Sequence, residues 1–297
     1  MFARLSSVLR GCLTSLVLAL NTLLIFALML LPALIKLLPI APLRGLCDRV
    51  LNALASAWVA VNNGWIALAA PRARWDVAGL EGLHPRGWYL VASNHQSWVD
   101  ILVLQRVFHG RIPFLKFFLK RELIYVPVIG LAWWALDFPF VRRGGDPGGA
   151  DLKATREACE KFKRIPTSVI NFVEGTRFSA AKHAEQRSPF RHLLKPKIGG
   201  LGMALATMGE QFEALLDVTI VYPQGTPTFW QLLSGRVEEV VVRVASRELT
   251  PELRGSNVMA NRAERVRVGR WMEQQWADKD RLIDELLAGR RSSGAAT

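Results

Sequence analysis

The sequence predicts an α/β domain in which helices flank a mainly parallel central sheet, preceded by an N-terminal membrane helix. Short apolar runs typical of buried strands alternate with segments that carry apolar residues at helical spacing. The strand runs are apolar on both faces, as in parallel sheets that helices cover on both sides. An uncharged run from Gly11 to Ile35 precedes them all and is long enough to span a bilayer as a helix.

Residues 1–70 are predicted to anchor the chain in a membrane. Arg4 and Arg10 precede the apolar run, so a cleaved signal peptide is the alternative. The run is longer than a usual signal core and no clear A-x-A site closes it, which favours a retained anchor. Basic residues flank the run on both sides, so the positive-inside rule does not fix its orientation.

A second uncharged stretch, Val50–Ala70, contains asparagines and a glycine that make it a poorer spanning segment. We expect a helix that lies on the membrane or packs against the first helix, and a second span stays open. Pro32 and Pro39 leave room for an interfacial or re-entrant segment instead of a full span.

Residues 71–297 are predicted to form a separate α/β domain, because the composition changes after Ala70. Continuous or alternating apolar runs predict strands within 74–83, 87–95, 167–178, 215–223 and 236–246. Amphipathic or small-residue patterns predict helices over 98–108, 151–165, 199–209 and 257–289. Glycine and proline predict a loop over 144–151.

The net charge limits the kinds of partner, and the cysteine content limits disulfides and metal sites. A net charge of +13 requires an anionic partner, and nucleic acid and anionic lipid headgroups are the usual ones. No basic face with interleaved aromatic residues marks a nucleic-acid module. Cys12, Cys47 and Cys159 are scattered and have no metal-ligand spacing, so we expect neither a disulfide framework nor a metal site.

The stretch "ASNHQSWVD" places a histidine after a predicted buried strand and an aspartate five residues later. On one continuous helix these side chains would lie about 140° apart. We therefore expect His95 in the turn before a helix, Ser97 as its N-cap and Asp100 in its first turn. Asp100 then accepts a hydrogen bond from one imidazole nitrogen and leaves the other nitrogen basic. Because the motif contains no protein nucleophile, such a pair suits direct deprotonation of a substrate hydroxyl. The alternative is a capping box, in which Asp100 only stabilises the helix start.

Basic and polar residues follow other apolar runs. Glu174–Arg177 ends a predicted strand, where Gly175 permits close backbone approach to a ligand and Arg177 suits a phosphate. Ligands bind at the carboxyl ends of parallel strands, so we expect this block to meet Asn94 and His95 in one site. The alternative is an ordinary polar turn with a surface arginine.

Two further cations lie beside apolar segments. Arg143 follows a strand-like run at a loop entrance, and Lys120 abuts an apolar segment. If they have no role in binding, Arg143 is simply solvated at the loop entrance and Lys120 extends its ammonium group to the membrane surface.

Taken in order, these blocks resemble the lysophosphatidate acyltransferase family, the PlsC-like glycerolipid acyltransferases, and within it a bacterial inner-membrane branch. The resemblance covers Trp75 to Pro223. The matching positions are Asn94, His95, Asp100, Lys120, Pro127, Gly130, Phe140, Val141, Arg143, Glu174, Gly175, Thr176, Arg177 and Pro223. Asp137 stands where the family has glycine, which puts the local loop geometry in question.

The resemblance implies the glycerolipid acyltransferase fold and an enzyme that acylates the free sn-2 hydroxyl of lysophosphatidic acid to give phosphatidic acid. The donor is acyl-CoA or acyl carrier protein, and no metal or bound cofactor is implied. His95 would be the base and Asp100 would orient it. The implied substrate-binding residues are Asn94, Lys120, Arg143, Glu174, Gly175, Thr176 and Arg177. Of these, the cations would bind the acceptor's phosphate, with Lys120 the weaker candidate, while Glu174 and Gly175 would help place the glycerol portion.

The expected location is a bacterial inner membrane with the catalytic domain facing the cytoplasm, where acyl donors are found. The expected partners are membrane phospholipid, lysophospholipid and the acyl donor, and not nucleic acid. Apolar residues between Ile112 and Trp134 are expected to face lipid or form an acyl groove. Three alternatives stay open: an acyltransferase for another lysolipid acceptor, a catalytically degenerate lipid-binding protein, and a membrane-attached nucleic-acid binder.

Overall fold

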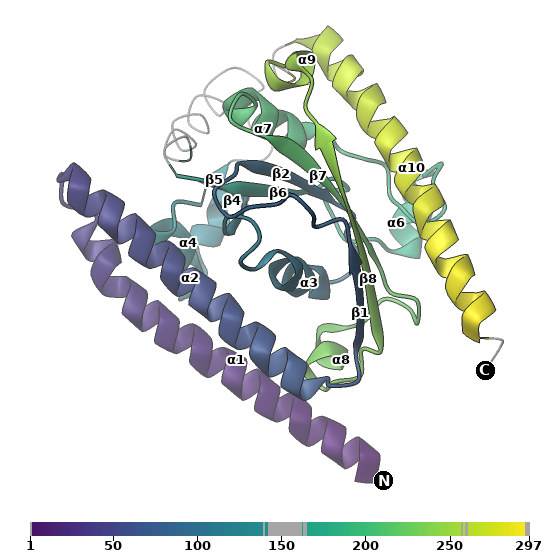
Figure 1. The fold of residues 1–297 in the computed structure, drawn as a ribbon, viewed down its shortest axis with the longest axis horizontal. Helices are drawn as coiled ribbons and strands as arrows, with labels where there is room; N and C mark the ends of the chain where they lie inside the picture. Colours follow the sequence, from purple (N-terminus) through teal and green to yellow (C-terminus); the bar gives the residue numbers. More distant parts are fainter. Residues whose placement is uncertain are drawn as a thin grey trace.

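A helical hairpin lies against a layered α/β domain in the computed structural model, which describes residues 2–138, 140–141, 162, 165–256, 258 and 261–294 (Figure 1). The helices are α1 (Phe2–Ile35), α2 (Ala41–Ala69), α3 (Val99–Phe108), α4 (Ile129–Ala135), α6 (Ala180–Gln186), α7 (Gly199–Met208), α8 (Phe229–Leu233), α9 (Pro251–Arg254) and α10 (Arg262–Gly294). The strands are β1 (Arg74–Ala78), β2 (Tyr89–Ser93), β3 (Leu115–Phe117), β4 (Leu119–Lys120), β5 (Phe140–Val141), β6 (Ser168–Phe172), β7 (Ala214–Val221) and β8 (Glu239–Glu248).

The main sheet of the described chain has six strands in the order β1-β8-β7-β2-β6-β3. Its neighbouring strands are parallel except for the antiparallel pair β7 and β8. Strands β4 and β5 form a separate small parallel pair. The predicted α/β class with a mainly parallel sheet is therefore confirmed.

Alternate residues of the central strands pack into two different cores, as the two-residue period of a strand requires. Leu90 of β2 packs into a cluster with residues of α7 and α10. Its neighbours Tyr89 and Val91 pack into a second cluster that contains residues of α3. The sheet is thus the middle layer of the domain, with α10 on the side away from the hairpin (Figure 1).

Several elements differ from their predicted bounds. Helix α10 begins at Arg262, later than predicted, because the Asn261 side chain caps it by accepting a hydrogen bond from the Ala263 amide at 2.9 Å. The first predicted strand, by contrast, occupies Arg74–Ala78, within its predicted range. Helices α6 and α8 were not predicted, since seven and five residues are too short to show a helical period. The predicted helix at 151–165 lies almost wholly outside the described residues.

Helices α1 and α2 pack against each other along their length and form the hairpin. Polar side chains meet inside it: Asn21 donates to the Asn62 side chain at 2.7 Å, and the Trp58 indole donates to the Thr22 hydroxyl at 3.0 Å. Among the described helices, Ser6–Ile35 is the segment long and apolar enough to cross a membrane. Of the two arrangements expected for the second apolar stretch, the structure has the one in which it packs against the first helix, and the helix begins earlier than expected, at Ala41.

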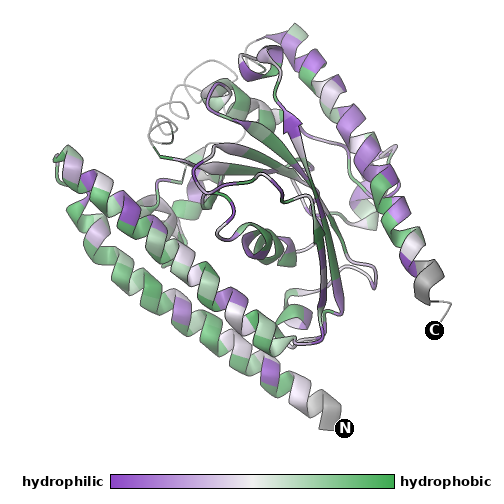
Figure 2. Ribbon diagram, viewed as in Figure 1, coloured by the Kyte–Doolittle hydropathy of each residue, from purple (hydrophilic) through white to green (hydrophobic). Residues whose placement is uncertain are grey.

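Helix α1 consists mostly of hydrophobic residues (Figure 2), and many of its leucines are exposed. Leu9, Leu16, Leu20, Leu23, Leu24, Leu31 and Leu34 are each more than half exposed. Leucines in such numbers on one face of a helix indicate a surface that contacts lipid or another apolar partner.

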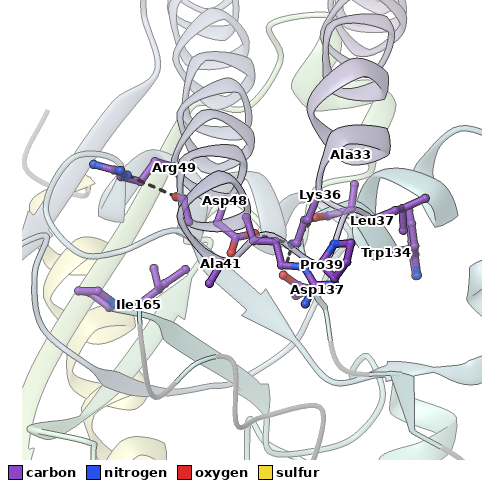
Figure 3. A pocket seen from close by; sticks show the side chains of 14 residues that line it. Ala33, Lys36, Leu37, Pro39, Ala41, Asp48, Arg49, Trp134, Asp137 and Ile165 are labelled. Carbon is purple, nitrogen blue, oxygen red and sulfur yellow. Dashed lines mark hydrogen bonds and ion pairs between the residues drawn. The ribbon is translucent and has the colours of Figure 1, made fainter.

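The turn of the hairpin is tied to the α/β domain by an ion-paired cluster (Figure 3). Lys36 lies between the carboxylates of Asp48 in α2 and Asp137, which follows α4. Asp137 has a φ of +58°, in the left-handed region that glycine favours, so the loop keeps a glycine-like backbone with aspartate in place. The three residues of this cluster line a cavity of about 750 Å³.

Candidate active site

The sheet brings the two predicted polar blocks together. Strands β2 and β6 are parallel neighbours, and their last residues, Ser93 and Phe172, lie side by side in register. The segments that follow are joined by a hydrogen bond from the Phe178 amide to the His95 carbonyl at 2.7 Å. The prediction that the His95 block and the Glu174–Arg177 block meet is therefore confirmed.

His95 and Asp100 form the predicted hydrogen-bonded pair, with 2.8 Å between Nδ1 and Oδ2. His95 lies in the turn before α3, and Asp100 lies in the first turn of that helix. The helix begins at Val99, so Trp98 and not Ser97 occupies the N-cap position. Ser97 still supports the helix start, because its hydroxyl accepts from the Val99 amide at 3.2 Å.

Asp100 is fully buried and both of its oxygens are occupied. Besides the imidazole, Oδ2 accepts from the backbone amides of Gln96 at 2.6 Å and Ser97 at 2.8 Å. The Tyr222 hydroxyl donates to Oδ1 at 2.6 Å. The Asp100 carboxylate thus does both things that the sequence left open: it stabilises the start of the helix and it pairs with His95.

Tyr222 contacts Asp100 but was not predicted as a site residue from the sequence. Burial, followed by the nearby Asp100 charge, raises its pKa well above the usual value of 10, so the phenol remains a donor at neutral pH. A signal did exist, because Tyr222 directly follows β7, the strand next to β2, at the same edge of the sheet.

The His95 imidazole is clamped on one side by Phe172, with ring centroids 3.9 Å apart and planes at 13°. With Nδ1 donating to Asp100, Nε2 is the basic nitrogen, and no residue in the described chain hydrogen-bonds it. The side chain is 11% exposed and lines a cavity of about 650 Å³. This arrangement suits removal of a proton from a hydroxyl bound in the cavity.

The cavity is mostly apolar, and its wall comes from both parts of the molecule. The α/β domain supplies His95, Trp98 and the Gly175–Arg177 turn. The segment between 114 and 138 supplies aromatic and aliphatic side chains: Phe114, Phe117, Phe118, Leu119, Leu123, Ile129, Trp133, Leu136 and Phe138. The hairpin supplies Thr22, Ile25, Phe26, Met29, Ala55 and Trp58. A long apolar ligand with one polar end fits such a lining.

Glu174 does not line this cavity. Its side chain is fully buried, and its two oxygens accept from the backbone amides of His95 at 2.8 Å and Leu194 at 2.9 Å. Burial raises its pKa to about 7. The geometry makes Glu174 a brace for the His95 backbone and places its carboxylate outside the lining of the cavity.

Asn94 is also directed into the protein. Its side-chain amide donates to the Ile220 carbonyl at 2.9 Å and accepts from the Ile220 amide at 2.8 Å. These bonds lock the end of β2 to β7 and thereby fix the residue before His95.

The three residues after Glu174 do border the cavity. Gly175 has a φ of +68°, a conformation in which a side chain would be strained. The Thr176 hydroxyl accepts from the Lys182 ammonium at 2.7 Å. The Arg177 guanidinium lies over the Trp98 ring, 4.6 Å from its centroid. Trp98 and Lys182 were not predicted as site residues.

The remaining predicted cations lie wholly or partly outside the described residues. The backbone of Lys120 belongs to β4, but its side chain, like the whole of Arg143, lies outside what the structure describes. Within the described residues no group of three or more histidine, cysteine or carboxylate side chains could hold a metal ion.

Comparison with known proteins assigns the chain to a family. A family model described as "Acyltransferase" matches residues 74–225, just over half of the chain. The protein therefore belongs to the acyltransferase family, over almost the same span as the resemblance noted in the sequence.

Curated relatives include the protein named 1-acyl-sn-glycerol-3-phosphate acyltransferase 2 of Arabidopsis thaliana. It is 28% identical over 213 residues, which cover 67% of this chain and 52% of that protein. The delta form from Bos taurus is 25% identical over 212 residues, covering 66% and 52%. The chain thus spans about half the length of the curated relatives it matches.

A solved structure has a similar fold. The structure titled as the 1-acyl-sn-glycerophosphate (LPA) acyltransferase PlsC from Thermotoga maritima aligns with a TM-score of 0.57 and 19% identity. The alignment covers 96% of this chain and 97% of that one, hairpin included. The shared fold supports the architecture of a hairpin joined to an α/β domain.

Proposed function

We propose that the protein transfers a fatty acyl chain from acyl-CoA or acyl carrier protein to the free sn-2 hydroxyl of lysophosphatidic acid, giving phosphatidic acid for phospholipid synthesis. The observation that carries the proposal is the His95–Asp100 pair, whose basic Nε2 borders an apolar cavity with Arg177 at its edge. Family membership and the names of the curated relatives support the same reaction.

The proposed step begins with a lysolipid whose tail lies in the apolar cavity. His95 Nε2 takes the proton of the sn-2 hydroxyl while Asp100 stabilises the imidazolium that forms. The hydroxyl oxygen attacks the thioester carbonyl, and a C–O bond replaces the C–S bond as the tetrahedral intermediate collapses. The thiolate leaves with the proton that the imidazolium returns. No acyl-enzyme forms, in line with the absence of an activated serine or cysteine beside His95 in the described residues.

Arg177 supplies the acceptor specificity in this proposal, because its guanidinium can bind two phosphate oxygens at once. Arg143 and Lys120 remain proposed phosphate ligands on the strength of the family resemblance. Asn94 and Glu174 act through the backbone of the His95 loop, and Gly175 and Thr176 border the acceptor. The reaction needs no metal or bound cofactor.

We also propose that the hairpin holds the enzyme on the cytoplasmic face of a bacterial inner membrane, where both donors are available. The apolar helix Ser6–Ile35 and the leucine-rich face of α1 support membrane attachment. The net charge of +13 suits a surface of anionic lipid.

The test is acyl transfer by detergent-solubilised protein from labelled acyl-CoA or acyl carrier protein to a panel of lysolipids. We expect product with lysophosphatidate from the wild type and none from His95→Ala. His84→Ala is the matched control, because His84 is exposed and does not line the cavity, and it should keep its activity. Turnover by His95→Ala close to the wild-type rate would refute the mechanism, and a different preferred lysolipid would refute the acceptor.

A further inference from the structure

Trp98 occupies a position that neither helix formation nor core packing explains. It directly precedes α3 and its side chain makes no capping hydrogen bond, because the Ser97 hydroxyl accepts from the Val99 amide at 3.2 Å instead. It is 56% exposed, so burial does not account for so large a side chain. The indole ring does contact a charged group, because the Arg177 guanidinium lies over its face.

The Arg177 guanidinium, whose residue borders the cavity, is held by an aromatic ring. No carboxylate in the described part of the chain forms an ion pair with it, and its guanidinium lies on the face of the indole. A cation on a π face is attracted by the ring without spending its N–H donors, whereas a carboxylate would occupy them. The guanidinium therefore keeps its charge and its donors available to an anion.

The stack has a fixed place relative to the proposed base. Trp98 lies between His95 and Asp100 in the chain, and Arg177 immediately precedes Phe178, whose amide bonds the His95 carbonyl. Both ring and guanidinium border the cavity that His95 lines. The Lys182 ammonium, which donates to the Arg177 carbonyl at 3.1 Å, adds positive potential at the same turn.

We propose that Trp98 is a positioning residue for acceptor binding: its indole face orients the Arg177 guanidinium toward the phosphate monoester of the lysolipid. This inference rests on the proposed function. Trp98 acts on binding through Arg177 and takes no part in proton transfer, so its loss should affect KM for the acceptor and spare kcat.

The experiment compares Trp98→Phe, which keeps an aromatic face, with Trp98→Leu, which keeps an apolar side chain without one. With lysophosphatidate in mixed micelles, we expect Trp98→Leu to raise KM about two- to fivefold, the size of an exposed cation–π contact, with kcat within about twofold. Trp98→Phe should keep most of the affinity, with a KM close to that of the wild type. In an Arg177→Ala background the two variants should behave alike. Trp134→Leu, which removes an exposed indole that does not line this cavity, is the control for membrane contact.

Equal KM values for Trp98→Phe and Trp98→Leu, or the same penalty with and without Arg177, would overturn the proposal and indicate a lipid-contacting tryptophan instead. A second readout separates this result from failure of the proposed function. Calorimetric binding of lysophosphatidate without acyl donor should be weakened by Trp98→Leu and by Arg177→Ala, whether or not the wild type turns over. Unchanged binding in both variants would also overturn the proposal.

Discussion

At the scale of single residues, the Asp100 carboxylate combines two tasks. It orients the His95 imidazole, and it accepts two backbone amides and the Tyr222 hydroxyl that hold the turn together. An amide in its place retains one acceptor oxygen but loses the charge that stabilises an imidazolium.

Asp100→Asn should therefore lower kcat by about 10²–10⁴-fold, the usual contribution of an oriented general base. Tyr222→Phe is the graded comparison, because it removes the phenol bond to Oδ1 and leaves the His95 bond intact; its kcat should stay within about tenfold of the wild type. Steady-state kinetics on both proteins, with circular dichroism to verify folding, measure the difference. Equal losses in the two variants would mean that Asp100 matters for the turn and not for the imidazole.

Glu174 gives stability a pH dependence of known sign. Burial raises its pKa from 4.5 to about 7, so the native state holds the proton at a pH where the unfolded chain has released it. Stability from this group is greatest below pH 4.5 and is lost as the pH rises to 7. The loss is of the order of 3 kcal/mol, at about 1.4 kcal/mol per pKa unit.

Glu174→Gln cannot titrate, so its thermal stability should fall less steeply between pH 4.5 and 7 than that of the wild type. It should also be less stable at low pH, because the amide NH₂ faces one of the two backbone donors. Glu185→Gln, an exposed carboxyl on α6, is the control and should keep the wild-type slope. Thermal unfolding followed by circular dichroism across this range makes the comparison. Identical slopes in Glu174→Gln and the wild type would place the titration elsewhere.

At the scale of elements, α1 has two different faces. Its inner face packs on α2 through paired polar groups, and its outer face exposes leucines. The outer side chains add little to folding, so charges introduced there should affect attachment to lipid and leave the fold intact.

The double variant Leu24→Glu/Leu31→Glu places two carboxylates on that outer face, where the native side chains are 60% and 66% exposed. Each substitution removes the free energy gained when a leucine side chain inserts into lipid. Binding of the double variant to phosphatidylglycerol vesicles should therefore weaken roughly tenfold or more. Ala288→Glu adds negative charge on α10, on the opposite side of the molecule, and should bind as the wild type does. Vesicle co-sedimentation measures both. Undiminished binding by the double variant would exclude this face as the anchor.

At the scale of the whole molecule, the C-terminal helix supports the site although it lies almost 200 residues from His95. The Trp276 indole donates to the Leu194 carbonyl at 3.1 Å, and the Leu194 amide bonds Glu174, which in turn holds the His95 amide. Nearby, the buried Lys279 pairs with Asp217 of β7 at 2.6 Å. Helix α10 is therefore part of the scaffold that holds the turn containing His95.

Lys279→Met leaves a buried carboxylate whose other partner is the more distant Arg247, at 3.3 Å. Loss of one member of a buried pair is costly, and we expect a loss of about 3 kcal/mol. Thermal unfolding should show this as a fall in Tm of roughly 6–12 °C. Arg281→Met on the same helix breaks an exposed ion pair and should change Tm little. A Tm of Lys279→Met equal to that of the wild type would show that Arg247 alone satisfies Asp217.

The sequence by itself determined the fold class, the apolar helix, the His95–Asp100 pair and the meeting of the two polar blocks. Each depends on local patterns: apolar runs, helical spacing, and the rule that parallel strands end at one edge. The tertiary structure decided which polar groups face the cavity. Asn94 and Glu174 lie in the same motifs as His95 and Arg177, yet their side chains turn inward to bond backbone amides of strands and loops distant in sequence. Those partners, like the Trp98 stack on Arg177, are set by long-range packing, which no local pattern encodes.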